Sequence, residues 1–316
     1  MTNIHFQQFR HGFTMLELIF VMIILGIVSS IASSAIVQIY ESYIVQRSLH
    51  NASLKSELAI NQLANRLTYR VDRSLLARKS GHTGIIEDTD VYPIRDVPIS
   101  DVNDYDSLEW IAYENDGFAS SASPGWSGFC DLDASSFTAI KSTGSSFTQE
   151  NTILNNLAGT ASGSTPNPAI IFTGTSKYQI TKNYETLNMY HASGNIFPVT
   201  LAGNILTFTG GGDRNVTNMV YTEFYQLLAS AYAVVPENEH TVNGVTVWDL
   251  ILYSNYQPWL GENYTDGTSS LLAKNVSVFR FKEERNSIRI KLCTVESFGL
   301  ESDKKMSSCK EKAVIR

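Results

Sequence analysis

The sequence predicts an α+β protein in which one long N-terminal helix packs on a C-terminal antiparallel β-sheet domain. Three observations support this fold class. An apolar run occupies residues 13–40, helical amphipathic spacing continues to about residue 78, and hairpin signals dominate the second half. Strands and helices do not alternate there, so we expect an antiparallel sheet. The 316 residues therefore divide into a leader, a helix and one large body.

The leader, residues 1–12, is short and polar, and residues 13–40 carry a single charge, Glu17. About 20 apolar helical residues span a bilayer, so residues 13–40 are predicted to be transmembrane. A secretory signal peptide has its cleavage site after the apolar run, whereas Gly12 precedes it. A carboxylate at membrane depth costs on the order of 2.5–3.5 kcal/mol on insertion scales. Glu17 is therefore expected to have a partner.

The segment GFTMLELIFVMIILGIV, residues 12–28, resembles the class III signal of type IV prepilins and type II secretion pseudopilins. The resemblance implies that prepilin peptidase cuts between Gly12 and Phe13 and that the new Phe13 amine is methylated. It also implies that Glu17 neutralises the amine of a neighbouring subunit during assembly. A pair within one subunit is an alternative, since residues 13 and 17 lie four apart. An ordinary signal anchor with a chance glutamate is the alternative to the whole resemblance.

The stem, residues 41–79, has apolar side chains that recur mostly every three or four residues: Leu49, Ala52, Leu54, Leu58, Ile60, Leu63, Leu67, Val71 and Leu75. This spacing predicts an amphipathic helix. Joined to the membrane run, it gives one helix over residues 13–79 that ends near Arg78 and is roughly 100 Å long at 1.5 Å per residue. We expect the stem half to pack on a sheet, as in pilins, with a coiled-coil dimer stalk as the alternative.

The body, residues 80–316, contains a Ser/Gly/Thr-rich insertion at residues 119–168, which we expect Trp126 and Phe129 to attach to the rest. Strands are expected at residues 108–113, 169–173, 196–201, 205–209 and 246–253, with turns at residues 203–204 and 242–245. Residues 226–235 are ambiguous between helix and strand. Two closing strands, VSVFRF and IRIKL, flank a charged turn and resemble the end of J-type minor pseudopilins.

The charge of the body is uneven. Residues 80–272 carry 21 acidic and 5 basic side chains, whereas residues 273–316 carry 11 basic and 6 acidic ones. The excess of negative charge in residues 80–272 argues against direct nucleic-acid binding, because it repels phosphate groups. The acids at 87, 88, 90, 96, 101, 104, 106 and 109 lack the glycine and final glutamate of an EF-hand loop. We therefore expect a solvated acidic loop, and neither a metal site nor a cofactor.

Three cysteines occur, at positions 130, 293 and 309, and none has zinc-site spacing. An exported body permits disulfides. Cys293 and Cys309 are the expected pair, because closing a loop of roughly 15 residues contributes about 3 kcal/mol in a chain-entropy treatment. Cys130 is then free or paired outside the chain. Three buried free thiols are the alternative.

The function predicted from these features is structural: a minor pilin or pseudopilin of a type IV pilus or type II secretion pseudopilus. No G-x-S-x-G, P-loop, G-x-G-x-x-G or H-E-x-x-H motif occurs, so we expect no enzyme. Implied partners are prepilin peptidase, other pilins, the inner-membrane assembly platform, and lipid around residues 13–40. The expected location is the bacterial inner membrane, single-pass, with a cytoplasmic N-terminus and a periplasmic body, and then a surface filament. Alternatives are a DNA-uptake pseudopilus subunit and a membrane-anchored ligand binder that never assembles.

Overall fold

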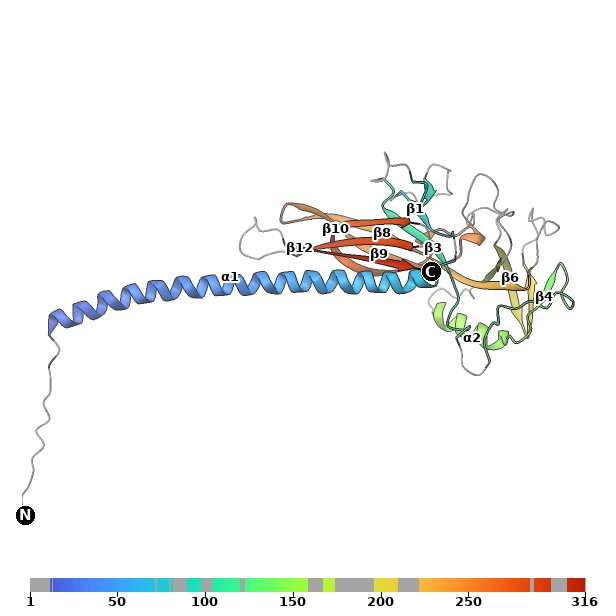
Figure 1. The fold of residues 1–316 in the computed structure, drawn as a ribbon, viewed down its shortest axis with the longest axis horizontal. Coiled ribbons are helices and arrows are strands. Elements are labelled where there is room, and N and C mark those ends of the chain that lie inside the picture. Colours follow the sequence, from blue (N-terminus) through green and yellow to red (C-terminus); the bar gives the residue numbers. More distant parts are fainter. Residues whose placement is uncertain are drawn as a thin grey trace, which may run out of the picture.

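The computed structural model describes residues 12, 14–71, 73–79, 81, 90–97, 104–119, 123–158, 167–173, 196–209, 222–284, 287–296 and 306–315. A long helix extends from a β-rich body, as Figure 1 shows. The helices are α1 (Met15–Thr68) and α2 (Phe147–Ala158), with short 3-10 turns η3 (Pro258–Leu260) and η4 (Tyr264–Asp266). The strands are β1 (Leu76–Arg78), β2 (Val91–Pro93), β3 (Ser107–Tyr113), β4 (Ala139–Lys141), β5 (Ala169–Thr173), β6 (Phe197–Ala202), β7 (Ile205–Phe208), β8 (Phe224–Val242), β9 (Val245–Tyr256), β10 (Thr268–Glu284), β11 (Ser287–Glu296) and β12 (Met306–Ile315).

The sheet runs in the order β12-β11-β10-β9-β8-β5-β6-β7-β4. Strand β8 organises it, because β9 pairs along one side while β3 and β5 share the other. Strand β3 also pairs with β1, which pairs with β2. Every pairing between these strands is antiparallel, so the predicted α+β class with an antiparallel sheet is confirmed.

The carboxyl half of α1 packs on the sheet through one narrow stripe: Ala52, Ser56, Ala59, Ile60, Leu63, Ala64 and Leu67. These residues recur every three or four positions, so they share one helix face. Apolar residues of β8 to β12 complete this cluster, including Val234, Leu250, Phe279, Ile290 and Val314. Polar contacts fix the register, since the Thr294 hydroxyl donates to the Ala52 carbonyl at 2.9 Å and Lys312 Nζ donates to Asn61 Oδ1 at 2.8 Å. The stem therefore packs on a sheet.

The helix ends at Thr68, ten residues before the predicted end at Arg78, so that expectation was wrong. Tyr69 caps the helix, and Arg73 has a φ of 62°, a left-handed conformation that no α-helix continues through. Residues 76–78 instead form β1 between β2 and β3. Apolar spacing alone could not show this, because pairing with a distant strand overrides local helical preference.

Residues 119–168 were expected to be an insertion with loop composition, but the described part contains β4 and α2. Trp126, Ile140, Phe147 and Leu154 are buried in a second core with residues of β5 to β8. Phe129, which was expected to attach this segment, is 39% exposed, although its ring contacts that of Phe224. A few large apolar residues among many small polar ones are therefore enough to fold this segment.

The other strand predictions agree with the structure. The two hairpin turns lie at residues 203–204 and 243–244, and the ambiguous residues 226–235 belong to strand β8. Strand β12 was not predicted. In its sequence, MSSCKEKAVI, apolar and polar residues do not alternate regularly, and the strand is held by pairing with β11 and by contact with α1.

Candidate functional site: the amino-terminal helix

The first turn of α1 is held by a cap that the sequence reasoning overlooked, since it assigned Thr14 no role. Thr14 has extended backbone geometry, and its side chain accepts a hydrogen bond from the Glu17 amide at 3.4 Å. Such an N-cap satisfies one of the four free amides at a helix start. The signal was present in the sequence, because threonine followed three residues later by glutamate is the pattern of a capping box.

Gly12 is exposed, and no described residue crowds it. A Cβ built on Gly12 would meet no atom of the described residues within 4 Å, and its φ lies outside the left-handed region. Neither contact with the described residues nor backbone geometry therefore requires a glycine here. Phe13 and the leader residues 1–11 lie outside the described residues. Of the two residues at the predicted cleavage site, the structure therefore describes only Gly12.

The Glu17 side chain is exposed on the first turn of α1. Its amide takes part in the Thr14 cap, and no described residue hydrogen-bonds or ion-pairs with its carboxylate. The carboxyl group lies on a surface that is otherwise apolar. Any compensating group must therefore come from outside the described part of the chain.

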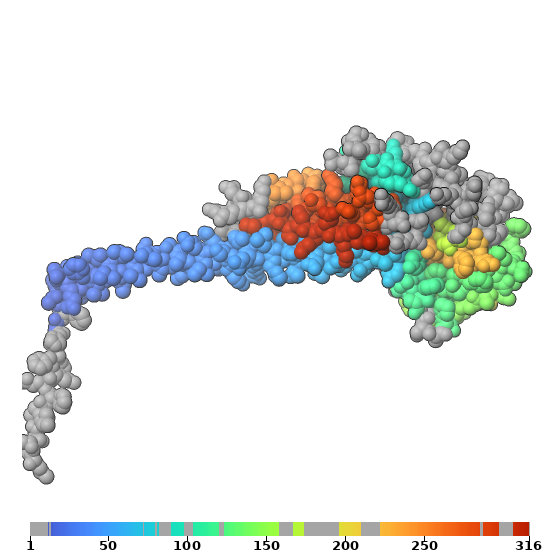
Figure 2. All heavy atoms as spheres, in the orientation of Figure 1, coloured from blue at the N-terminus to red at the C-terminus, as the bar shows by residue number. Residues whose placement is uncertain are grey.

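The amino half of α1 is bare. Large apolar side chains from Met15 to Ile39 are each 50–89% exposed, and none packs on the body. Figure 2 shows this half as a rod projecting from the rest of the molecule. The helix is long and apolar enough to cross a membrane. Contiguous apolar surface of this extent marks a membrane or protein contact.

The two cysteines expected to pair lie far from this helix end, on the sheet. Cys293 of β11 is directly opposite Cys309 of β12, and the two form a disulfide with a Cα–Cα distance of 4.0 Å. Cys130 is free and buried in the second core. The disulfide joins the edge strand to the strand beside it, and both strands contact α1.

Of the acids expected in a solvated loop, Glu109 is instead fully buried, so that expectation was wrong for this residue. Its Oε2 accepts from Arg78 Nε at 3.0 Å and from the terminal guanidinium nitrogen at 2.8 Å, while Tyr256 donates to Oε1 at 2.7 Å. A buried carboxylate held by three donors is a structural ion pair between β1 and β3. Residues 87, 88 and 101 lie outside the described residues. Among those described, no group of three or more His, Cys, Asp or Glu side chains is placed to hold a metal ion.

A second buried carboxyl group, Glu150 of α2, was missed entirely. It is 0% exposed, and neither carboxyl oxygen has a hydrogen-bond partner among the described residues. Two glycines face it, and because a Cβ on Gly117 or Gly125 would lie 1.8 or 2.1 Å from its Oε2, a larger residue at either position would displace the carboxyl group. Burial raises the pKa of Glu150 to about 8, and the neighbouring Glu114 and Asp116 carboxylates add to the rise. Near neutral pH, Glu150 is therefore mostly protonated.

Comparison with known proteins concerns the exposed end of the molecule. Residues 8–33 match the family described as the prokaryotic N-terminal methylation motif. No curated protein and no solved structure matches the chain. The matched segment contains Gly12, Thr14 and Glu17, and it points to a structural protein rather than an enzyme. The chain thus carries the class III signal peptide of type IV pilins, followed by a long apolar helix that fits a membrane-anchored, pilin-like protein.

Proposed function

We propose that the chain is a minor pilin or pseudopilin, a non-catalytic subunit of a type IV pilus or type II secretion pseudopilus. The observation that carries this proposal is the coincidence of the methylation motif with the bare half of α1. An uncovered apolar helix needs lipid before assembly and other apolar helices after it. The body then lies on the periplasmic side of the inner membrane, and the leader lies in the cytoplasm.

In this proposal, prepilin peptidase cuts between Gly12 and Phe13, and the Phe13 amine is methylated. The open space around Gly12 supports a requirement set by the peptidase rather than by the fold. Cleavage leaves a cationic amine four residues from Glu17 in hydrocarbon. Pairing of the amine of one subunit with the Glu17 carboxylate of the next lowers the energetic cost of both charges. Because the contact joins different surfaces head to tail, its repetition generates a helical filament.

Processing is tested by mass spectrometry of the full chain after co-expression with a prepilin peptidase. The expected N-terminus is Phe13 carrying one methyl group. Gly12→Val should leave the precursor uncut while leaving the body folded, because no residue of the described body contacts this position. An intact Met1 beside a peptidase that processes another prepilin would contradict the proposal and favour an anchored protein that never assembles.

Assembly is tested by recovering filaments from cells that express variants of the full chain. Glu17→Ala should still be cleaved but should be absent from sheared filaments. Glu41→Ala is the matched control, because it removes an exposed carboxylate from the same helix just beyond the apolar run. Incorporation of Glu17→Ala at the level of the control would remove the role assigned to Glu17.

A further inference from the structure

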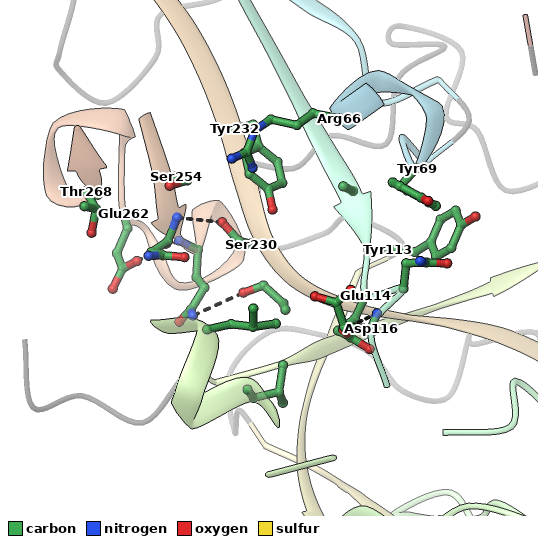
Figure 3. A pocket seen from close by; sticks show the side chains of 18 of the residues that line it. Arg66, Tyr69, Tyr113, Glu114, Asp116, Ser230, Tyr232, Ser254, Glu262 and Thr268 are labelled. Carbon is green, nitrogen blue, oxygen red and sulfur yellow. Dashed lines mark hydrogen bonds between the residues drawn. The ribbon is translucent and has the colours of Figure 1, made fainter. Parts of the chain in front are cut away.

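A pocket of about 660 Å³ lies where the carboxyl end of α1 meets strands β3, β8 and β9 and helix α2. Figure 3 shows the pocket with side chains converging from these separate elements. Pockets of about 300–1,000 Å³ are typical of small-molecule sites. The pocket is remote in sequence from the methylation motif, and the inference below does not depend on filament assembly.

Tyrosines form one wall of this pocket. Tyr69 and Tyr113 pack edge to face with ring centroids 5.7 Å apart. The Arg66 guanidinium lies over the Tyr232 ring at 5.3 Å, and the buried Trp110 stacks on that ring at 5.6 Å. These mutual contacts hold the wall in place. At the rim of the pocket, the Asp116 and Asp266 side chains are exposed and Glu262 is half-buried.

Four carboxylates line the pocket and are contributed by two different segments. Glu114 and Asp116 follow β3, whereas Glu262 and Asp266 belong to the turns between β9 and β10. In Figure 3, Glu262 lies across the pocket from Glu114 and Asp116. Arg66 is the single basic residue among the described residues that line the pocket. In the part of the chain that the structure describes, no lysine or arginine ion-pairs with any of the four carboxylates.

Backbone donors already occupy some of these oxygens and hold the side chains in position. Glu114 accepts from the amides of Asp116 at 2.7 Å and Gly117 at 2.8 Å, and from Trp126 Nε1 at 3.0 Å. One oxygen of Glu262 accepts from the Gln257 amide at 2.6 Å, and one oxygen of Asp266 accepts from an amide at 2.8 Å. No described residue donates a hydrogen bond to the second oxygen of Glu262 or to the second oxygen of Asp266. The Asp116 carboxylate accepts none from these residues at either oxygen.

The chemistry of this lining selects a cation of a particular shape. An excess of carboxylates around an open pocket attracts positive ligands and repels anions. An ammonium group has a positive charge and three donors with no acceptor, so it complements carboxylate oxygens that lack donors. Because the acids lie on opposite sides of the pocket, an extended organic cation can reach both sides, whereas a compact ion cannot.

We propose that this pocket binds alkylammonium ligands, with the Asp116 carboxylate as the acceptor for an ammonium group on one side and the Glu262 carboxylate as the acceptor on the other. The ligand is either a free linear diamine, whose two ammonium groups reach both carboxylates, or a lysine side chain of another protein, whose single ammonium group reaches one of them. Both sources present the same ammonium chemistry on an apolar stem, and the experiment below separates them.

The test is isothermal titration calorimetry of the full-length chain in a non-ionic detergent. The ligands are 1,5-diaminopentane and Nα-acetyl-lysine methylamide, with 1,5-pentanediol as the uncharged control. We expect one ammonium ligand to bind per chain and the diol not to bind. Asp116→Asn and Glu262→Gln should each raise the Kd of the diamine by about tenfold or more, as loss of a hydrogen bond to a charged group does. Glu262→Gln keeps an acceptor oxygen for the Gln257 amide, and Asp116 accepts no hydrogen bond from a described residue, so both variants should retain the fold.

Asp133→Asn provides the matched control, because it removes one exposed carboxylate that does not line the pocket. Its Kd should equal that of the unmodified chain. Tighter binding of the diamine would identify a free diamine as the ligand, and tighter binding of the lysine derivative would identify a protein side chain. The proposal is overturned if neither ammonium compound binds, if the diol binds equally well, or if the two pocket variants bind like Asp133→Asn.

Discussion

The two halves of α1 belong to one unbroken helix, yet they are built for different surroundings. Residues 15–39 expose apolar side chains all round the helix, whereas the half that contains Ala52, Leu63 and Leu67 buries only one stripe. In the first half, the hydrophobic surface has no cover within the described chain. In the second half, strands β10 to β12 provide the cover. Helix geometry is the same in both, so the difference lies wholly in what surrounds the side chains.

The same contrast holds for two glutamates whose carboxylates have no hydrogen-bond partner among the described residues. Glu17 is exposed on the bare half of α1, and Glu150 is sealed inside the body against two glycines. The body accommodates Glu150 by favouring its protonated form. A subunit that assembles can instead provide Glu17 with an external cation. The missing partner of Glu17 is therefore expected to be a group outside the described chain, whereas Glu150 is accommodated by keeping its proton.

The largest expected effect separates the two halves of the helix directly. Leu63→Ala empties a fully buried site and should lower the free energy of unfolding of the body by about 2–5 kcal/mol. Ile24→Ala, at a position 58% exposed, should leave it unchanged. Urea unfolding of the full chain in non-ionic detergent, followed by tryptophan fluorescence, measures both. Equal destabilisation by the two substitutions would show that the amino half also supports the body.

The next effect concerns the strands that cover the stem. Cys309→Ala removes the link between β11 and β12 and should lower the free energy of unfolding by about 3 kcal/mol. Adding dithiothreitol to the unmodified chain should reproduce most of this loss and should not affect the variant further. If the reductant leaves the free energy of unfolding of the unmodified chain unchanged, the disulfide does not stabilise the strands β11 and β12 that pack on the stem.

The third effect is a pH dependence that comes from the body and not from the bare helix. The folded pKa of Glu150, about 8, lies above the ordinary value of 4.5. Between these values the unfolded chain releases a proton that the folded chain keeps, so the free energy of unfolding falls as pH rises. The glutamine in Glu150→Gln cannot ionise. The free energy of unfolding of this variant should therefore exceed that of the unmodified chain by about 1–3 kcal/mol near pH 8, and the two should differ little near pH 4.5.

Unfolding curves at the two pH values measure this difference, and Glu239→Gln is the control because it removes an exposed carboxylate. A gain that is the same at both pH values would mean that Glu150 acts through packing and not through its proton.

The smallest effect is local to the start of α1. Thr14→Ala removes the cap and should destabilise the first turn by about 1 kcal/mol, without changing unfolding of the body. Amide hydrogen exchange of the full chain in detergent should show roughly fivefold faster exchange at Glu17, whereas Thr14→Ser should preserve the slower rate. Identical exchange in the two variants would show that the hydroxyl does not hold this turn.

Features that depend on neighbours along the chain could be predicted from the sequence. The apolar run, the hairpin turns at residues 203–204 and 243–244, and the alternating strands β10 and β11 all carry local patterns. No comparable local pattern marks the end of α1, the helix α2 or the strand β12. In each of these, contacts with residues distant in sequence decide the local conformation, so periodicity in one segment is insufficient.

By itself, the sequence determined the organisation of the amino terminus: a polar leader, Gly12, an apolar helix and one acid, Glu17. These features could be predicted because they occupy one continuous stretch of the chain. Only the tertiary structure decided that Thr68 ends the helix, that Arg78 neutralises the buried Glu109, and that Glu150 lies sealed beside Glu114. The reason is physical. A membrane segment is specified by its own composition against a uniform solvent, whereas burial, pairing and protonation inside the body depend on groups brought together from distant parts of the chain.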